Sequence, residues 1–181
     1  DYGALTGLDE TVTPRFCRRG VRQHINFPMD ISSYPLAEAQ EYVRNLARLR
    51  CNAITFHSYR GQWHGSAGGF FYGQRHEVPR APSLAGAVRN RRWYCMPEAE
   101  PVLDDPERRG LLAKDWLRAV ISSAKAASME VTLSIELDGY PEGELQAMAR
   151  AACEDYPQID VLEFISSEGG GSAEGYTLEN V

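Results

Sequence analysis

The stretch that decides the fold is residues 130–166, which read EVTLSIELDGYPEGELQAMARAACEDYPQIDVLEFIS. Its first part, Glu130 to Leu137, is rich in β-branched and apolar residues and predicts a strand. Residues Pro141 to Tyr156 have a helical composition and end before Pro157, which predicts a helix. A second strand is predicted at Asp160 to Ser166. Two strands that are separated by a helix cannot form a hairpin, so this stretch predicts a parallel β-α-β unit.

The same kind of unit recurs toward the N-terminus. Strands are predicted at Gly20 to Phe27 and at Asn52 to Tyr59, and helices at Leu36 to Leu49 and at Leu111 to Ala127. The resulting order, β-α-β-α-β-α-β, predicts an α/β fold with a parallel sheet and right-handed crossovers. Two architectures fit this order: a half or incomplete TIM barrel, or a complete small doubly wound sheet.

A long insertion, residues 60 to 109, separates the second strand from the next helix without clear periodicity. We treat it as part of a single domain over residues 1–181. Long loops inside compact domains are usually functional or disordered, and the many aromatic residues favour an ordered functional segment. Trp63 and Arg75 are candidate substrate-binding residues, because sugar rings stack on aromatic side chains and arginine pairs with a sugar carboxylate.

Composition excludes several classes of function. The chain has 181 residues and a net charge of −6 with no basic stripe, so nucleic acid is not an expected partner. The sequence contains no apolar run of about 18 residues, so it predicts no membrane span. Dinucleotide and phosphate-loop motifs are absent from the sequence, so no cofactor is expected. The chain opens on Asp1 without a visible signal peptide, so a leader was either removed or never included, and the location stays open, with an extracytoplasmic one among the alternatives.

The four cysteines lie far apart in the sequence, without a C-x-x-C pair. This spacing argues against a structural zinc site and against a disulfide-dense scaffold. Buried free thiols are therefore the expected state. The cysteines are Cys17, Cys51, Cys95 and Cys153.

Every predicted strand ends in polar or ionisable residues. Ligands bind at the carboxyl ends of parallel strands in both candidate architectures. These strands turn polar at that end, although strands buried on both faces are usually apolar throughout. We therefore expect a polar binding site at this edge of the sheet. Its candidate residues are Asn26, His57, Tyr59, Glu136, Asp138 and Glu168.

Glu168 is the candidate catalytic residue. It follows the fourth strand and precedes Gly169 to Gly171, which allow a ligand to approach the backbone closely. Glycoside hydrolysis commonly needs a carboxylic acid that protonates the leaving oxygen. Glu163 lies five residues earlier, on the opposite side of a regular strand, and is expected to be structural, paired with a cation on a helix.

Several motifs resemble the catalytic barrel of family 20 hexosaminidases and family 67 α-glucuronidases. They are Arg19-Gly20-Val21 before the first strand, Asn52 to His57 in the second, Phe71 to Arg75 in the insertion, and Ser166 to Gly170 after the fourth. The resemblance implies a glycoside hydrolase with a carbohydrate substrate and Glu168 at the position of the acid. Ser167 stands where the hexosaminidases have the aspartate that orients the substrate's acetamido group, so their substrate-assisted mechanism is not implied.

Two other functions fit the same residues. A metal-dependent sugar isomerase would use His57, Glu136, Asp138 and Glu168 as oxygen and nitrogen ligands. A non-catalytic carbohydrate-binding domain would use a doubly wound sheet, and its binding would not depend on Glu168. If the chain is half of a barrel, the second catalytic carboxylate lies outside it, and we expect the 181-residue chain to be inactive alone.

Overall fold

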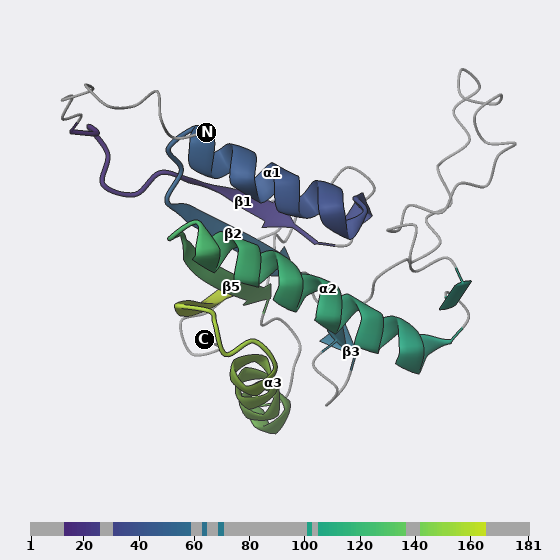
Figure 1. The fold of residues 1–181 in the computed structure, drawn as a ribbon. Coiled ribbons are helices and arrows are strands. Elements are labelled where there is room, and N and C mark those ends of the chain that lie inside the picture. The colour runs from purple at the N-terminus through teal and green to yellow at the C-terminus, as the bar shows by residue number, and fades with distance from the viewer. Residues whose placement is uncertain are drawn as a thin grey trace, which may run out of the picture.

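A computed structural model describes residues 13–25, 31–58, 63–64, 69–70, 101–102, 105–136 and 142–165 (Figure 1). Its main feature is a sheet of four parallel strands in the order β1-β2-β5-β6. These strands are β1 (Gly20–His24), β2 (Ala53–Ser58), β5 (Glu130–Glu136) and β6 (Val161–Ile165). The parallel α/β fold that the sequence predicts is therefore confirmed.

Three helices connect the strands. They are α1 (Leu36–Arg48), α2 (Pro106–Ala126) and α3 (Glu142–Asp155), and a short 3-10 helix η1 (Ile31–Ser33) precedes α1. Inside the long insertion, β3 (Trp63–His64) and β4 (Gly69–Phe70) form a small antiparallel pair that the sequence analysis did not predict. No described helix is long and apolar enough to cross a membrane.

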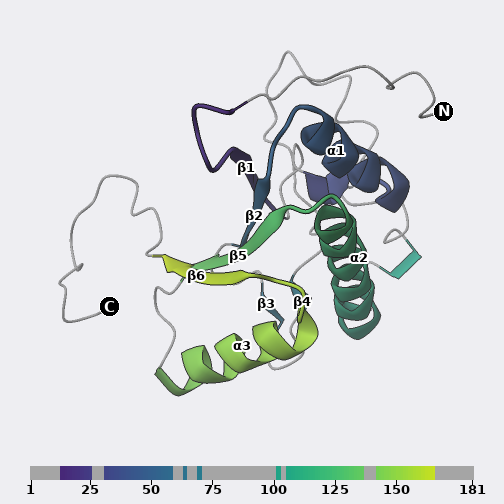
Figure 2. The ribbon, with the colours of Figure 1, turned by 60° about the vertical axis from the view of Figure 1, so that its left-hand side comes forward.

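The order of the strands in the sheet is the same as their order in the chain. A doubly wound sheet reverses its strand order at a switch point, which sends helices to both faces. Right-handed crossovers that always advance in one direction leave every helix on one face. Figure 2 shows the three helices on the same side of the sheet. This arrangement is the one that four successive units of an incomplete TIM barrel have.

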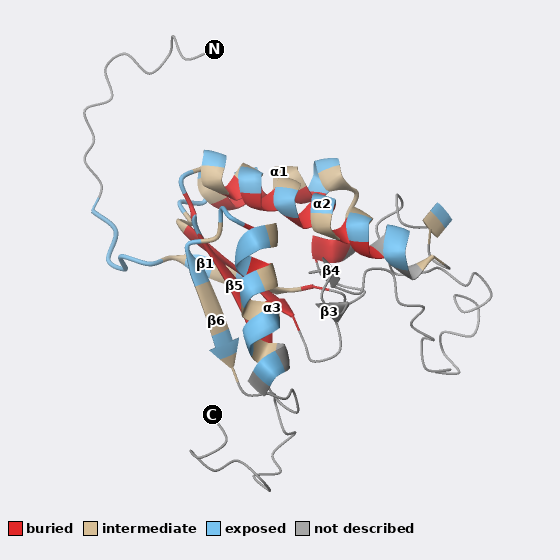
Figure 3. Cartoon of the chain, turned by 90° about the horizontal axis from the view of Figure 1, so that it is seen from below, coloured by how far each residue is buried: buried red, intermediate tan, exposed pale blue. Residues whose placement is uncertain are grey.

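The helices pack on an apolar face of the sheet. Strand side chains alternate between the two faces, and Ile54 and Phe56 of β2 share one face with Val131 and Leu133 of β5 because the register pairs them. All four are fully buried. They form the core together with the inner sides of α1 and α2, as the buried residues in Figure 3 show. This packing leaves the opposite face of the sheet for polar side chains.

Helix α2 begins at Pro106, about one turn before the predicted Leu111. The Asp105 carboxylate accepts a hydrogen bond from the Arg108 backbone N–H, and Pro106 occupies the first turn, where its missing N–H costs nothing. The prediction was wrong because Pro106 is followed by the charged residues 107–109, which show no apolar periodicity. The insertion correspondingly ends before the helix and not at residue 109.

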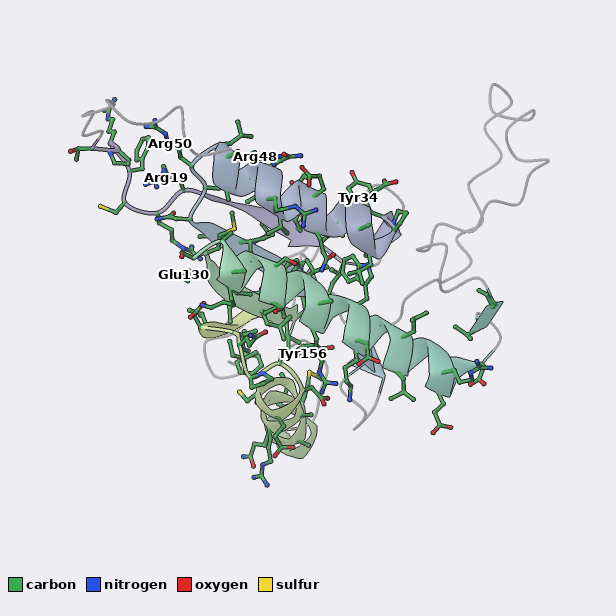
Figure 4. The ribbon with its side chains drawn as sticks, viewed as in Figure 1. Arg19, Tyr34, Arg48, Arg50, Glu130 and Tyr156 are labelled. Carbon is green, nitrogen blue, oxygen red and sulfur yellow. The ribbon has the colours of Figure 1, made fainter. Side chains whose placement is uncertain are left out.

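Hydrogen bonds of the Asn52 side chain hold the amino-terminal end of β1 in place beside β2. Its side-chain oxygen accepts from the Arg19 N–H at 2.8 Å, and its amide donates to the Cys17 carbonyl at 2.8 Å. Arg19 in turn donates to the Arg50 carbonyl at 2.8 Å, and both arginines lie at this end of the molecule, as does Glu130 (Figure 4). These bonds fix β1 beside β2 and so set the register of the residues at the other end.

Candidate functional site

The candidate site lies on the face of the sheet that turns away from the helices. Alternation along each strand directs one residue in two to this surface. We call it the polar face: Arg22, His24, Thr55, His57, Thr132, Ser134, Glu136 and Glu163. Five of these residues, from β2 and β5, are buried, which is unusual for such polar side chains unless they are hydrogen-bonded.

His57 of β2 is at the centre of this surface. Its Nδ1 atom lies 3.3 Å from Arg22 Nη1 and 3.2 Å from Ser134 Oγ. Its ring also meets the ring of His24 edge to face, with the centroids 5.2 Å apart. The two strands on either side of β2, β1 and β5, therefore contribute groups that hold one imidazole in place.

Burial keeps His57 neutral. The pKa of His57 is lowered from 6.5 to about 4, mainly because the ring is removed from water; the positive charge of Arg22 and the nearby His24 act in the same direction, whereas Glu163 acts in the opposite one. At neutral pH the ring therefore carries a single proton and can donate one hydrogen bond and accept another.

Glu136 is the second buried ionisable group on the polar face. Its Oε1 atom lies 3.6 Å from His57 Nε2, and the two side chains are 3% and 4% exposed. With a neutral imidazole, this contact joins a dipole to a carboxyl group rather than two opposite charges. The sequence analysis expected His57 and Glu136 to lie close together at the carboxyl ends of their strands, and the structure brings them together.

Arg22 and Glu163 complete the polar face. Arg22 Nη2 donates to Glu163 Oε2 at 2.7 Å, and Arg22 Nη1 donates to Ser134 Oγ at 3.0 Å. The Ser134 hydroxyl donates a hydrogen bond to Glu163, and this bond, supported by Arg22, lowers the pKa of the Glu163 carboxyl. Arg22, His57, Ser134 and Glu163 thus form one hydrogen-bonded network on the polar face, with one residue from each of the four strands.

The predicted role of Glu163 was correct in part. Glu163 is paired with a cation, but the cation is Arg22 on strand β1 and not a residue on a helix. The reason is that Glu163 faces away from the helices, because its register partner is Ser134 on the polar face.

Arg22 and Ser134 were missed altogether. The sequence analysis looked for polar residues only at the strand ends. It did not use the alternation of polar and apolar residues along the strands, which is visible in GVRQHI, AITFHS and EVTLSIE. That alternation extends polarity over the whole face.

Several predicted site residues lie outside the described residues. They are Asn26, Tyr59, Arg75, Asp138 and Glu168. For Trp63 only the backbone is described, in β3, where it pairs with Phe70. In the sequence, Glu168 follows Ile165, the last residue of β6, by three positions.

Among the described residues, no group of three or more histidine, cysteine or carboxylate side chains is arranged to hold a metal ion. Cys17, Cys51 and Cys153 are free thiols. The expectation that they are buried was wrong for Cys17 and Cys153, which are exposed because Cys17 precedes β1 and Cys153 lies on the outer side of α3, and Cys51 is only half-buried. Cys95 lies outside the described residues.

Comparison with known proteins adds no relative to this description: no family model and no curated protein matches the chain.

Proposed function

We propose that this chain carries part of the active site of a glycoside hydrolase-like enzyme that cleaves a carbohydrate, with Glu168 as the general acid. The observation that carries the proposal is the buried pair of His57 and Glu136, 3.6 Å apart, at the carboxyl ends of adjacent parallel strands. In barrel enzymes this end of the strands holds the active site. The His57–Glu136 pair would bind substrate there.

The chemistry of the pair suits a sugar hydroxyl. A hydroxyl group donates one hydrogen bond and accepts others, and it is therefore recognised by an acceptor beside a donor. A carboxylate supplies the acceptor and a neutral imidazole N–H the donor. The imidazole is held in place by the network on the polar face, and Glu136 is buried beside it, so little side-chain entropy is lost when a ligand binds.

The charges on the polar face favour a neutral, hydroxylated ligand over nucleic acid. Arg22 is already paired with Glu163, and the net charge of the chain is −6. Phosphate groups would meet more carboxylates than cations on this surface. A carbohydrate is the partner that we propose.

The proposed general acid is tested by Glu168→Gln, with glycosides whose leaving groups differ in basicity. A general acid is needed for a poor leaving group such as an alkoxide and hardly at all for a dinitrophenolate. Because the four described strands do not close a barrel, the assay uses the protein translated from the complete reading frame. We expect kcat/KM to fall by about 10²–10⁴ for alkyl glycosides and far less for dinitrophenyl glycosides.

The matched control is Glu154→Gln, which changes an exposed glutamate on α3. It should leave kcat/KM unchanged for both kinds of substrate. An equal loss on both kinds of substrate would contradict the role of Glu168 as the acid. A stoichiometric divalent metal that is required for turnover would favour the isomerase. Glycan binding without turnover, unchanged in Glu168→Gln, would favour the non-catalytic binding domain.

A further inference from the structure

The strongest geometric constraint on the polar face concerns the proton of His57. Arg22 Nη1 lies 3.3 Å from His57 Nδ1 and 3.0 Å from Ser134 Oγ. A guanidinium group has only hydrogen-bond donors, and each terminal nitrogen carries two hydrogens. One Arg22 nitrogen can therefore donate to both atoms, and His57 Nδ1 faces a donor.

The Ser134 hydroxyl does not change this conclusion. It accepts from Arg22 and donates its own hydrogen to Glu163, as described above, and its oxygen, which keeps a second lone pair, lies 3.2 Å from His57 Nδ1. A proton on Nδ1 could use that lone pair, but it would also lie beside the Arg22 guanidinium, 3.3 Å from Nδ1, where it would meet another N–H and a positive charge. The favourable arrangement leaves a lone pair on Nδ1 and the proton on Nε2.

We infer that Arg22 is a positioning residue that fixes His57 as the Nε2–H tautomer and aims this N–H toward Glu136. The role in binding a ligand rests on the proposed function, whereas the tautomer itself does not. The 3.6 Å between His57 Nε2 and Glu136 Oε1 is longer than a hydrogen bond between them. Under the proposed function, a substrate hydroxyl that reached both atoms would accept from the imidazole N–H and donate to the carboxylate.

The ligand class that this geometry selects is a polyol hydroxyl rather than an anion. An anionic oxygen could accept from Nε2–H but would face the Glu136 carboxylate without a hydrogen to donate. The Nδ1–H tautomer would present two acceptors, Nε2 and the carboxylate, and would lose the donor that distinguishes the site. Arg22 thus determines specificity without touching the ligand.

The tautomer is measured directly by ¹⁵N NMR of the imidazole nitrogens, in the same protein that the enzyme assay uses and without any ligand. We expect His57 in the wild-type chain to have a protonated Nε2 and an unprotonated Nδ1 at neutral pH. Arg22→Met should lose this preference, and Arg22→Lys should restore it in part because lysine keeps a donor. Ser134→Ala is the matched control and should keep the wild-type tautomer, since Arg22 remains.

A protonated Nδ1 in the wild-type chain would overturn the inference, even if every variant failed to fold. The same holds if Arg22→Met folds and keeps the wild-type tautomer. In the enzyme assay, Arg22→Met should raise KM several-fold with little change in kcat, and an unchanged KM beside a changed tautomer would overturn the positioning role. Because the spectrum is recorded without sugar, failure of the glycosidase proposal leaves the tautomer result intact.

Discussion

At the scale of single residues, burial decides what each polar group can do. His57 and Glu136 are both almost fully buried, and the hydrogen-bonded network around His57 offsets the cost of burying its ring. Arg22 donates to His57 and Ser134 and also pairs with Glu163, so one side chain satisfies three others. The candidate site therefore depends on residues that never need to touch a ligand.

The neutral state of His57 predicts a pH dependence of stability. The pKa of His57 is lowered from 6.5 to about 4, so the unfolded chain binds a proton below pH 6.5 that the folded chain does not bind until about pH 4. Stability should fall over this window, by about 2 kcal/mol between roughly pH 7 and 4.5. The pKa of the Glu163 carboxyl is lowered from its usual 4.5. The stability that this carboxylate contributes is therefore lost at lower pH, as the pH falls below that value.

Urea denaturation at several pH values measures this loss. Arg22, His24, Glu136 and Glu163 remain around the site in His57→Gln, so a comparison with this variant isolates the histidine. The wild-type curve should be steeper between pH 6.5 and 4 than the variant's curve. Parallel curves would contradict the assignment of His57 as a buried neutral base.

At the scale of helices and strands, the sequence predicted the order, the type and the parallel pairing of the main elements. Apolar and β-branched runs and helical periodicity are local signals, and the crossover rule converts their order into a topology. The start of α2 could not be found from periodicity, because Asp105 and Pro106 set it by capping. The role of Arg22 was also not predictable, because it depends on which strands become neighbours.

The contact between β1 and β2 predicts a strict requirement for glycine at position 20. A Cβ atom on Gly20 would lie 2.3 Å from the Ala53 carbonyl oxygen and 2.9 Å from the Ala53 Cβ, and the backbone of β2 cannot yield cheaply. We expect Gly20→Ala to lower the free energy of unfolding by about 1–3 kcal/mol. Chemical denaturation measures the change.

The control for this substitution is Gly110→Ala in α2, where an added Cβ meets no described atom within 4 Å. Alanine is a better helix former than glycine, so this variant should be more stable by up to about 1 kcal/mol. A neutral Gly20→Ala would show that β1 and β2 are farther apart than described here.

At the scale of the whole molecule, the network on the polar face ties together the two outermost strands of the sheet. β1 and β6 are separated by β2 and β5, which amounts to about 14 Å in a flat sheet. Arg22 of β1 nevertheless donates to Glu163 of β6 at 2.7 Å. Long side chains and a sheet that curves toward its polar face together explain this reach. Curvature of this sense, away from the helices, is what a barrel requires.

This contact predicts energetic coupling between the outer strands. Both side chains are 36–40% exposed, which limits the value of a simple ion pair to about 1 kcal/mol or less, but the shared bonds to Ser134 and His57 add to the coupling. A double-mutant cycle with Arg22→Met and Glu163→Gln should give a coupling energy near 1 kcal/mol in urea denaturation. The pair of Arg44 and Glu41, which lies within α1, should give less because it is a solvent-exposed contact of one helix. If the effects of the two polar-face substitutions are additive, the coupling energy is zero and this network does not couple β1 to β6.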